Sequence, residues 1–123
     1  MNLVDSSGWL EYFADAKNAD FFADAIENTE ELIVSSINVY EVFKRILQQR
    51  NNEAALQAVA IMHQSKIIDV TPSIAMAAAK ISHEMKLPMA DSLILVTAHE
   101  QHAILWTQDA DFKGIQNVEY VKK

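Results

Sequence analysis

Cysteine is absent from this chain of 123 residues, so the protein has no disulfide bond and no thiolate zinc site. That absence is compatible with a reducing compartment. Only two glycines occur, Gly8 and Gly114, and they stand too far apart to form a glycine-rich phosphate loop. Nucleotide binding through a backbone cradle is therefore excluded. Because there are only two prolines as well, we expect short connections and mostly helices.

Positive charge and long apolar runs are also scarce. Ten Lys and Arg residues face seventeen Asp and Glu residues, and the net charge of −7 argues against a general nucleic-acid coat protein with a basic face. No apolar run approaches the roughly 20 residues that span a bilayer, and the N-terminus lacks the basic segment of a signal peptide. We therefore expect a soluble, cytoplasmic protein that makes no membrane contact.

Short apolar runs alternate with amphipathic segments along the whole chain. The runs predict strands at residues 2–4, 32–34, 66–70, 103–107 and 118–121. The amphipathic segments predict helices at residues 7–14, 20–28, 37–49, 53–64, 71–86 and 88–102, with a turn or short helix at 109–112. Strands that alternate with helices favour right-handed βαβ units. We therefore expect an α/β fold with a mostly parallel sheet, covered on both faces, in one domain of residues 1–123.

Four acidic residues stand where a strand passes into a loop or just inside a helix: Asp5, Glu41, Asp91 and Asp109. The carboxyl ends of parallel strands converge on one edge of a sheet, where ligand sites form. Four carboxylates gathered there would repel one another unless a cation joined them. Carboxylates suit Mg²⁺ or Mn²⁺, ions that lower the pKa of a bound water and stabilise charge on a phosphoryl group. A divalent-metal site is therefore the first hypothesis.

Two of these acids have an ordinary structural alternative. Asp5 precedes Ser6 and Ser7, and any of the three suits a helix N-cap. Glu41 is followed four residues later by Arg45, so a solvated helical ion pair would also explain it. For both acids the local sequence favours the structural role.

The other two acids point more strongly to a site. Asp91 has apolar neighbours at helical spacing, so its carboxylate lies on a face that should be buried and needs partners there. Asp109 follows the apolar strand that ends at Thr107, and Asp111 lies two residues further on. Acids are common turn formers, and Thr107 is either strand filler or a hydroxyl that positions a water or a carboxylate.

The order of these segments resembles that of PIN-domain nucleases. Residues 2–7 resemble the opening motif of the family, residues 35–45 its second motif with Glu41 as the acid, residues 88–94 its third motif and residues 107–112 its fourth. The resemblance covers essentially the whole chain, and the four motifs together are specific. At this size the chain is most similar to the VapC toxins of bacterial and archaeal toxin–antitoxin pairs.

The resemblance implies a three-layer α/β/α sandwich with a parallel sheet of about five strands. It also implies a Mg²⁺- or Mn²⁺-dependent endoribonuclease, in which a metal-activated water attacks an RNA phosphodiester in line and leaves a 5′-phosphate. The implied metal-binding residues are Asp5, Glu41, Asp91 and Asp109, supported by Ser6, Thr107 and Asp111. Family toxins form homodimers and are silenced by a VapB antitoxin, so both partners are expected. Gln108 departs from the pattern, because many relatives carry a basic residue there.

Other readings remain open at this point. Lys44, Arg45 and Arg50 form the only basic stretch, which either follows an RNA backbone or is a solvated helix end. His99 and His102 lack a third zinc ligand and the spacing of a zinc hydrolase motif.

A PIN ribonuclease with a housekeeping role in RNA processing, without an antitoxin, is the main alternative function. A Mg²⁺-binding receiver-like signalling module would need adjacent acids after the first strand, where this chain has serines.

Overall fold

The computed structural model describes all 123 residues, which are arranged around one five-stranded sheet. The strands are β1 (Asn2–Val4), β2 (Leu32–Ser35), β3 (Lys66–Ile68), β4 (Ile104–Thr107) and β5 (Val118–Tyr120). Every neighbouring pair is parallel, and the order across the sheet is β3-β2-β1-β4-β5. The first strand of the chain therefore lies in the middle, between β2 and β4.

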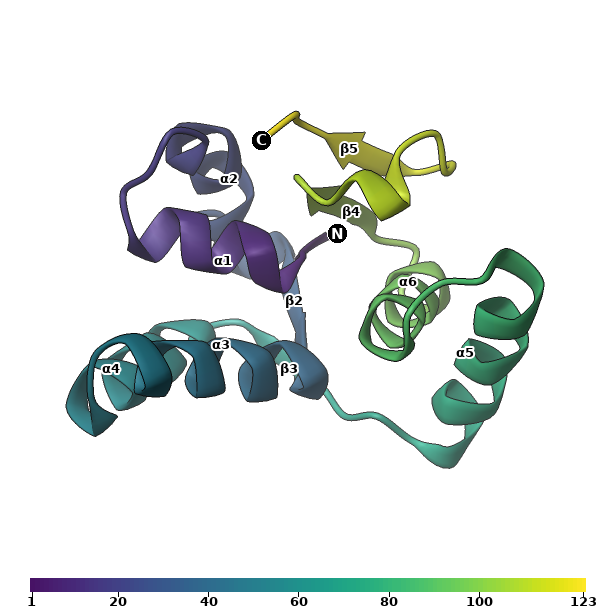
Figure 1. Ribbon diagram of the computed structural model, residues 1–123, viewed down its shortest axis with the longest axis horizontal. Helices are drawn as coiled ribbons and strands as arrows, with labels where there is room; N and C mark the ends of the chain where they lie inside the picture. The colour runs from purple at the N-terminus through teal and green to yellow at the C-terminus, as the bar shows by residue number, and fades with distance from the viewer.

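Helices cover both faces of this sheet. They are α1 (Ser6–Phe13), α2 (Ala19–Ile26), α3 (Ser36–Gln49), α4 (Asn52–Met62), α5 (Pro72–Met85) and α6 (Met89–Glu100). Two 3₁₀ helices, η1 (Thr29–Glu31) and η2 (Ala110–Phe112), precede β2 and follow β4. Figure 1 shows α1 to α4 gathered on one side of the molecule and α5 with α6 on the other. The predicted α/β fold, a three-layer sandwich around a parallel sheet of five strands, is confirmed.

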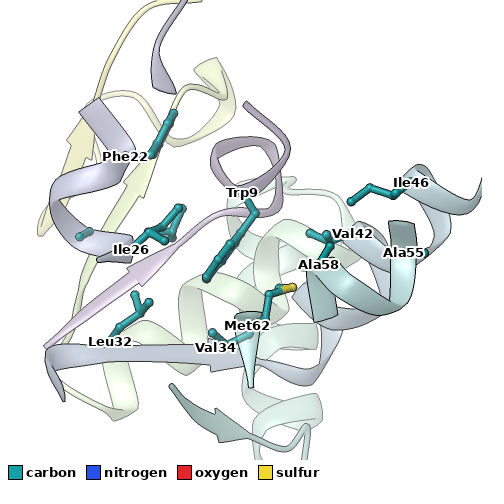
Figure 2. Packing of buried hydrophobic residues seen from close by; sticks show 12 residues of the cluster. Trp9, Phe22, Ile26, Leu32, Val34, Val42, Ile46, Ala55, Ala58 and Met62 are labelled. Atoms are coloured by element: carbon teal, nitrogen blue, oxygen red, sulfur yellow. The ribbon is translucent and has the colours of Figure 1, made fainter. Parts of the chain in front are cut away.

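Alternate side chains of the central strands enter two separate cores, because successive residues of a strand point to opposite faces. Val4 and Val34 belong to the larger core with α1 to α4, whereas Leu3 and Ile33 belong to the core with α6. Figure 2 shows Trp9 near the middle of the larger core, between the strands and the helices α3 and α4. Burial on both faces explains why these strands are continuous apolar runs in the sequence.

The predicted strands and helices occur in the predicted order, and the differences lie at their ends. Pro88 is the N-cap of α6 and not part of its first turn, because its carbonyl accepts the first helical hydrogen bond, from the Ser92 N–H. Strand β3 ends at Ile68, two residues early, since the Val70 N–H donates to the hydroxyl of Ser36 at 3.1 Å and not to a strand. No helix is both long and apolar enough to cross a membrane.

Close packing between α1 and α2 depends on Gly8. A Cβ atom at this position would lie 2.6 Å from the ring of Phe22 and 2.7 Å from the side chain of Val4. Both neighbours are fully buried, so neither has room to move aside. Glycine is therefore needed here for space, and it lets the first turn of α1 lie directly against the end of β1.

We expect Gly8→Ala to lower the free energy of unfolding by about 2–3 kcal/mol, the upper part of the range for overpacking, because the added methyl group meets fully buried side chains. Gly114→Ala is the matched control, since nothing lies within 4 Å of a Cβ atom there and only its φ of +84° opposes the change. We expect a loss of about 1 kcal/mol for that control. Urea denaturation of the three proteins measures both losses. Equal losses would show that space at Gly8 is not limiting.

Candidate functional site

The candidate site lies where the chain changes direction across the sheet. From β1 the chain continues to β2 and β3 on one side, whereas β4 and β5 add to the other side. Ligand sites of open parallel sheets form at such switch points, outside the carboxyl ends of the strands. Val4 pairs with Trp106, and the Asp5 N–H donates to the Trp106 carbonyl at 2.9 Å. Asp5 and Thr107 therefore leave the sheet side by side.

Asp5 is buried, with 4% of its surface exposed, and its carboxylate accepts three hydrogen bonds. The Ser6 N–H donates to Oδ1 at 2.8 Å, and the hydroxyls of Ser7 and Thr107 each donate to Oδ2 at 2.9 Å. The bond from Ser6 also makes Asp5 the N-cap of α1, so Asp5 can cap this helix and still belong to the predicted acidic site. Burial raises the pKa of Asp5 from 3.8 to about 6, although the hydrogen bonds act in the opposite direction.

Asp91, Asp109 and Asp111 form a group of acids close to Asp5. One carboxylate oxygen from each of the three lies within 4.8 Å of the others. Asp91 is half-buried in the first turn of α6, and Asp109 follows β4, where it accepts a hydrogen bond from the Asp111 N–H at 2.9 Å. Burial, followed by the charges of Asp109 and Asp5, raises the pKa of Asp91 from 3.8 to about 7. The apolar neighbours of Asp91 on α6 are buried as predicted, whereas Asp91 itself is half-buried.

Glu41 is held by a hydrogen bond from α1 and not by an ion pair within its own helix. The Ser6 hydroxyl donates to Oε1 of Glu41 at 2.7 Å. The helical ion pair with Arg45 does not form, because the only ion pair in the structure joins the N-terminal ammonium group and Glu31 at 3.6 Å. The structure therefore ties the second motif to the first through a contact 35 residues apart in sequence.

Asn38 is a residue of this arrangement that sequence reasoning missed. Its Oδ1 accepts from the Ser35 N–H at 3.0 Å, so its amide nitrogen faces Ser6 and donates to the Ser6 hydroxyl at 2.9 Å. Since Ser6 accepts from Asn38, its own proton is directed to Glu41. The capping-box position of Asn38, three residues after Ser35, is the one signal in the sequence that could have found it.

The structure brings most of the predicted residues to one open cleft of about 440 Å³, whereas Thr107, Asp111 and Arg50 do not line it. All four acids line it, together with Ser6: Asp5, Glu41, Asp91 and Asp109. Helix α3 adds four larger side chains, Tyr40, Lys44, Arg45 and Gln48. Thr107 is fully buried behind Asp5. Arg50 lies elsewhere, in a second groove at the C-terminal end of α3, so the structure does not bring it to Lys44 and Arg45 at the site.

Gln108 stands where a basic residue was expected, and it has a structural role in this protein. Its side chain is buried, donates to Oε1 of Glu11 at 3.2 Å and accepts from the amide of Asn18 at 2.9 Å. Asn18 in turn donates to the Lys122 carbonyl at 3.1 Å. Gln108 thus links the end of β4 to α1 and to the last residues of the chain, and it does not line the cleft.

His99 at the end of α6 and His102 just after that helix take no part in this site. His99 and His102 are exposed, and the only group of three or more possible metal-ligating side chains consists of Asp91, Asp109 and Asp111. A histidine zinc site is therefore not supported.

The segments that carry these residues also match a known family. The family model described as PIN domain matches residues 3–118, which include every acid of the cleft. The chain belongs to the PIN-domain family. No curated protein sequence matches it.

Solved structures share this PIN-domain fold over nearly the whole chain. A toxin–antitoxin complex from Klebsiella pneumoniae has a TM-score of 0.82 at 22% identity, covering 97% of this chain and 96% of that chain. VapC20 from Mycobacterium tuberculosis, described as a sarcin–ricin loop cleaving toxin, has a TM-score of 0.79 at 15% identity, with 94% and 95% covered. DNA-bound VapBC from Salmonella typhimurium has a TM-score of 0.75 at 16% identity, with 99% and 98% covered.

We expect the acids to make this PIN domain less stable as the pH rises. The pKa of Asp91, about 7, lies above its ordinary value of 3.8. The folded chain therefore binds more protons than the unfolded chain between roughly pH 4 and pH 7, and the stabilising contribution is lost as the pH rises through about 7. Asp91→Asn should remove this loss and, in EDTA at about pH 8, raise the unfolding free energy by about 1–2 kcal/mol, a figure discounted for solvent screening of a half-exposed group.

Thermal unfolding in EDTA at roughly pH 4 and pH 8 measures this effect. The melting temperatures of wild type and Asp91→Asn should differ by several degrees at the higher pH and little at the lower. Asp24→Asn, which removes an exposed acid from α2, is the control and should show no such difference. A gap that is the same at both pH values would contradict the role given to Asp91.

The hydrogen bonds that run from Asn38 through Ser6 to Glu41 predict energetic coupling between Asn38 and Ser6. Asn38→Ala and Ser6→Ala should each destabilise the protein, and the double variant should lose less than the sum by about 0.5–2 kcal/mol. Asn51 caps α4 through a similar bond, at 2.8 Å, but does not contact Ser6. Asn51→Ala combined with Ser6→Ala should therefore be additive in chemical denaturation. Additive losses for Asn38→Ala and Ser6→Ala would show that this hydrogen-bond network does not couple the two residues.

Proposed function

We propose that this PIN domain is a metal-dependent endoribonuclease that hydrolyses RNA phosphodiesters by in-line attack of water and leaves a 5′-phosphate. The observation that supports this most directly is the convergence of acids from β1, α6 and the end of β4 in one cleft. Burial and mutual repulsion raise the pKa of both Asp5 and Asp91. Carboxylates held together at such a cost favour a site that binds a cation.

The donor set of the cleft fits Mg²⁺ or Mn²⁺. The carboxylates with oxygens within 4.8 Å of one another are those of Asp91, Asp109 and Asp111, and Asp5 and Glu41 line the same cleft beside Asp91 and Asp109. Carboxylate oxygens are the ligands that these hard ions prefer. We assign the ion to Asp5, Glu41, Asp91 and Asp109, with Asp111 in support. When bound, the ion lowers the pKa of a water and stabilises the charge that develops on the phosphoryl group.

The other residues of the site keep these carboxylates in place. Ser7 and Thr107 hold Oδ2 of Asp5, and Ser6 holds Glu41. Groups that orient ligands in this way limit the rearrangement required when the ligand binds. Thr107 also accepts a hydrogen bond from the Asp109 N–H at 2.9 Å, so one hydroxyl positions two of the acids.

The cleft also carries cations that suit the phosphates of the proposed RNA substrate. Lys44 and Arg45 are exposed at the cleft and have no carboxylate within 4.0 Å. Such cations bind phosphates and supply most of the affinity that does not depend on sequence. The net charge of −7 makes the surface as a whole unfavourable for RNA, so we expect binding to depend on these two cations.

We further propose that the chain is the toxin of a toxin–antitoxin pair, active as a homodimer and silenced by a VapB-like antitoxin. The Klebsiella pneumoniae structure is described as a toxin–antitoxin complex and the Salmonella typhimurium structure as DNA-bound VapBC, and both match this chain over nearly its full length. A cytoplasmic location accords with an RNA target.

A housekeeping PIN ribonuclease without an antitoxin is the alternative. A receiver-like module has the strand order 2-1-3-4-5, which differs from the order found here.

Cleavage of RNA in Mg²⁺ or Mn²⁺ tests the enzymatic proposal. Asp5→Asn and Asp91→Asn should each lower the rate by at least about 100-fold, since each removes a ligand charge from the site. Asp24→Asn should cleave like wild type. Equal cleavage by all variants, or cleavage that persists in EDTA, would overturn the mechanism.

Expression in bacteria tests the toxin role separately. The wild-type chain should arrest growth, Asp5→Asn should not, and an antitoxin encoded by an adjacent open reading frame should restore growth. Active RNA cleavage without growth arrest, and without such a reading frame, would favour the housekeeping alternative.

A further inference from the structure

Tyr40 is the only exposed aromatic side chain of the protein, and it lies in the cleft. Its exposed fraction is 59%, whereas every other Trp, Tyr and Phe is buried or half-buried. It precedes Glu41 on α3, and both residues line the cleft. Single exposed apolar side chains are common on protein surfaces, and Tyr40 differs from the others in lying inside the cleft beside the acids, where a ligand can reach its ring.

A cation accompanies this ring. The ammonium group of Lys44 lies over Tyr40, 5.6 Å from the ring centroid. The two residues are four positions apart and so share one side of α3. Arg45 and Gln48 continue that side along the cleft. Helix α3 therefore presents an aromatic face followed by positively charged and amide groups, directly beside the acids.

The surroundings of Tyr40 favour a nucleotide over an apolar protein side chain. Only two of the eleven residues that line the cleft are hydrophobic, Leu10 and Tyr40 itself. An apolar anchor of a protein would need a dry pocket around it. A base needs only a flat aromatic face for stacking, with cations close by for the adjoining phosphates.

We propose that Tyr40 is a stacking platform for one unpaired base of the RNA, next to the phosphate that would lie at the proposed metal site. This proposal rests on the proposed ribonuclease function and limits its substrates to RNA with unpaired bases. Lys44 lies over one face of the ring, and the base stacks on the other face. Lys44 and Arg45 then contact the phosphates beside that base. A duplex keeps its bases stacked inside, so the cleft selects single-stranded or looped RNA, and stacking on Tyr40 tolerates any base.

Binding to short RNA oligonucleotides that carry 2-aminopurine at successive positions tests this proposal. The parent protein is the cleavage-deficient Asp5→Asn variant in Mg²⁺, so that the RNA stays intact. Adding Tyr40→Ala should weaken binding of the single strand about 5- to 150-fold, the equivalent of about 1–3 kcal/mol for one stacked base. It should also abolish the fluorescence quenching at one position. Tyr40→Phe and Tyr40→Trp should retain both properties.

Two controls separate stacking from general effects. Leu47 is another exposed apolar residue of α3 that does not line the cleft, so Leu47→Ala should bind RNA like the parent. A duplex of the same sequence should bind weakly and equally to the parent and to Tyr40→Ala. Lys44→Gln should weaken binding of every sequence alike and reduce its dependence on salt, as expected for a phosphate contact.

The outcomes distinguish this proposal from the ribonuclease function. If the parent binds the single strand and Tyr40→Ala binds it as tightly, with quenching unchanged, the platform is refuted while the ribonuclease proposal stands. If Tyr40→Ala weakens binding of an antitoxin and not of RNA, Tyr40 belongs to a protein interface and the platform is likewise refuted. If neither the parent nor wild type binds or cleaves RNA under any metal condition, the ribonuclease proposal fails first.

Discussion

The electrostatic repulsion among carboxylates at the carboxyl end of the sheet is the constraint around which this protein is built. The parallel pairing of β1 with β4 brings Asp5 next to Thr107 and close to Asp109. Helix α6 then adds Asp91 to the same place, at the cost of a pKa raised to about 7. Such an arrangement persists because the rest of the fold determines it, and the cation that we propose for this site would offset the repulsion.

The fold supplies this support from both layers of helices. Gly8 allows α1 to approach β1 and α2 so closely that Asp5 can cap the helix and still face the cleft. Helix α3 contributes in two ways. It carries Glu41, which accepts a hydrogen bond from Ser6 of α1, and Asn38, which orients that serine. It also carries Tyr40 and the two cations that line the cleft. One helix therefore holds a carboxylate of the site and the surface on which we place the RNA.

The sequence predicted those parts of the molecule that depend on local patterns. Continuous apolar runs marked the strands, because both faces of the sheet are buried. Apolar neighbours marked Asp91, because a carboxylate among them must be compensated. Glu41 was different, since its local setting favoured an ion pair with Arg45, and only the resemblance to PIN domains assigned it to the site.

Contacts between distant segments could not be predicted in this way. The bond from Asn38 to Ser6 spans 32 residues, and that from Asn18 to Gln108 spans 90. Neither leaves a periodic pattern, so the roles of Asn38 and Gln108 became visible only in the fold. The exposure of Tyr40 is of the same kind, because its place on an amphipathic helix is compatible with burial or with an open cleft.

The most direct test of the central claim is anomalous scattering from crystals soaked in Mn²⁺. If the repulsion among these acids exists to bind a divalent ion, anomalous density should appear between the carboxylates of Asp5, Asp91 and Asp109. Crystals of Asp91→Asn under the same conditions should show weaker density or none. Saturating Mn²⁺ that leaves this place empty in the wild-type protein, or that binds only elsewhere, would contradict the account.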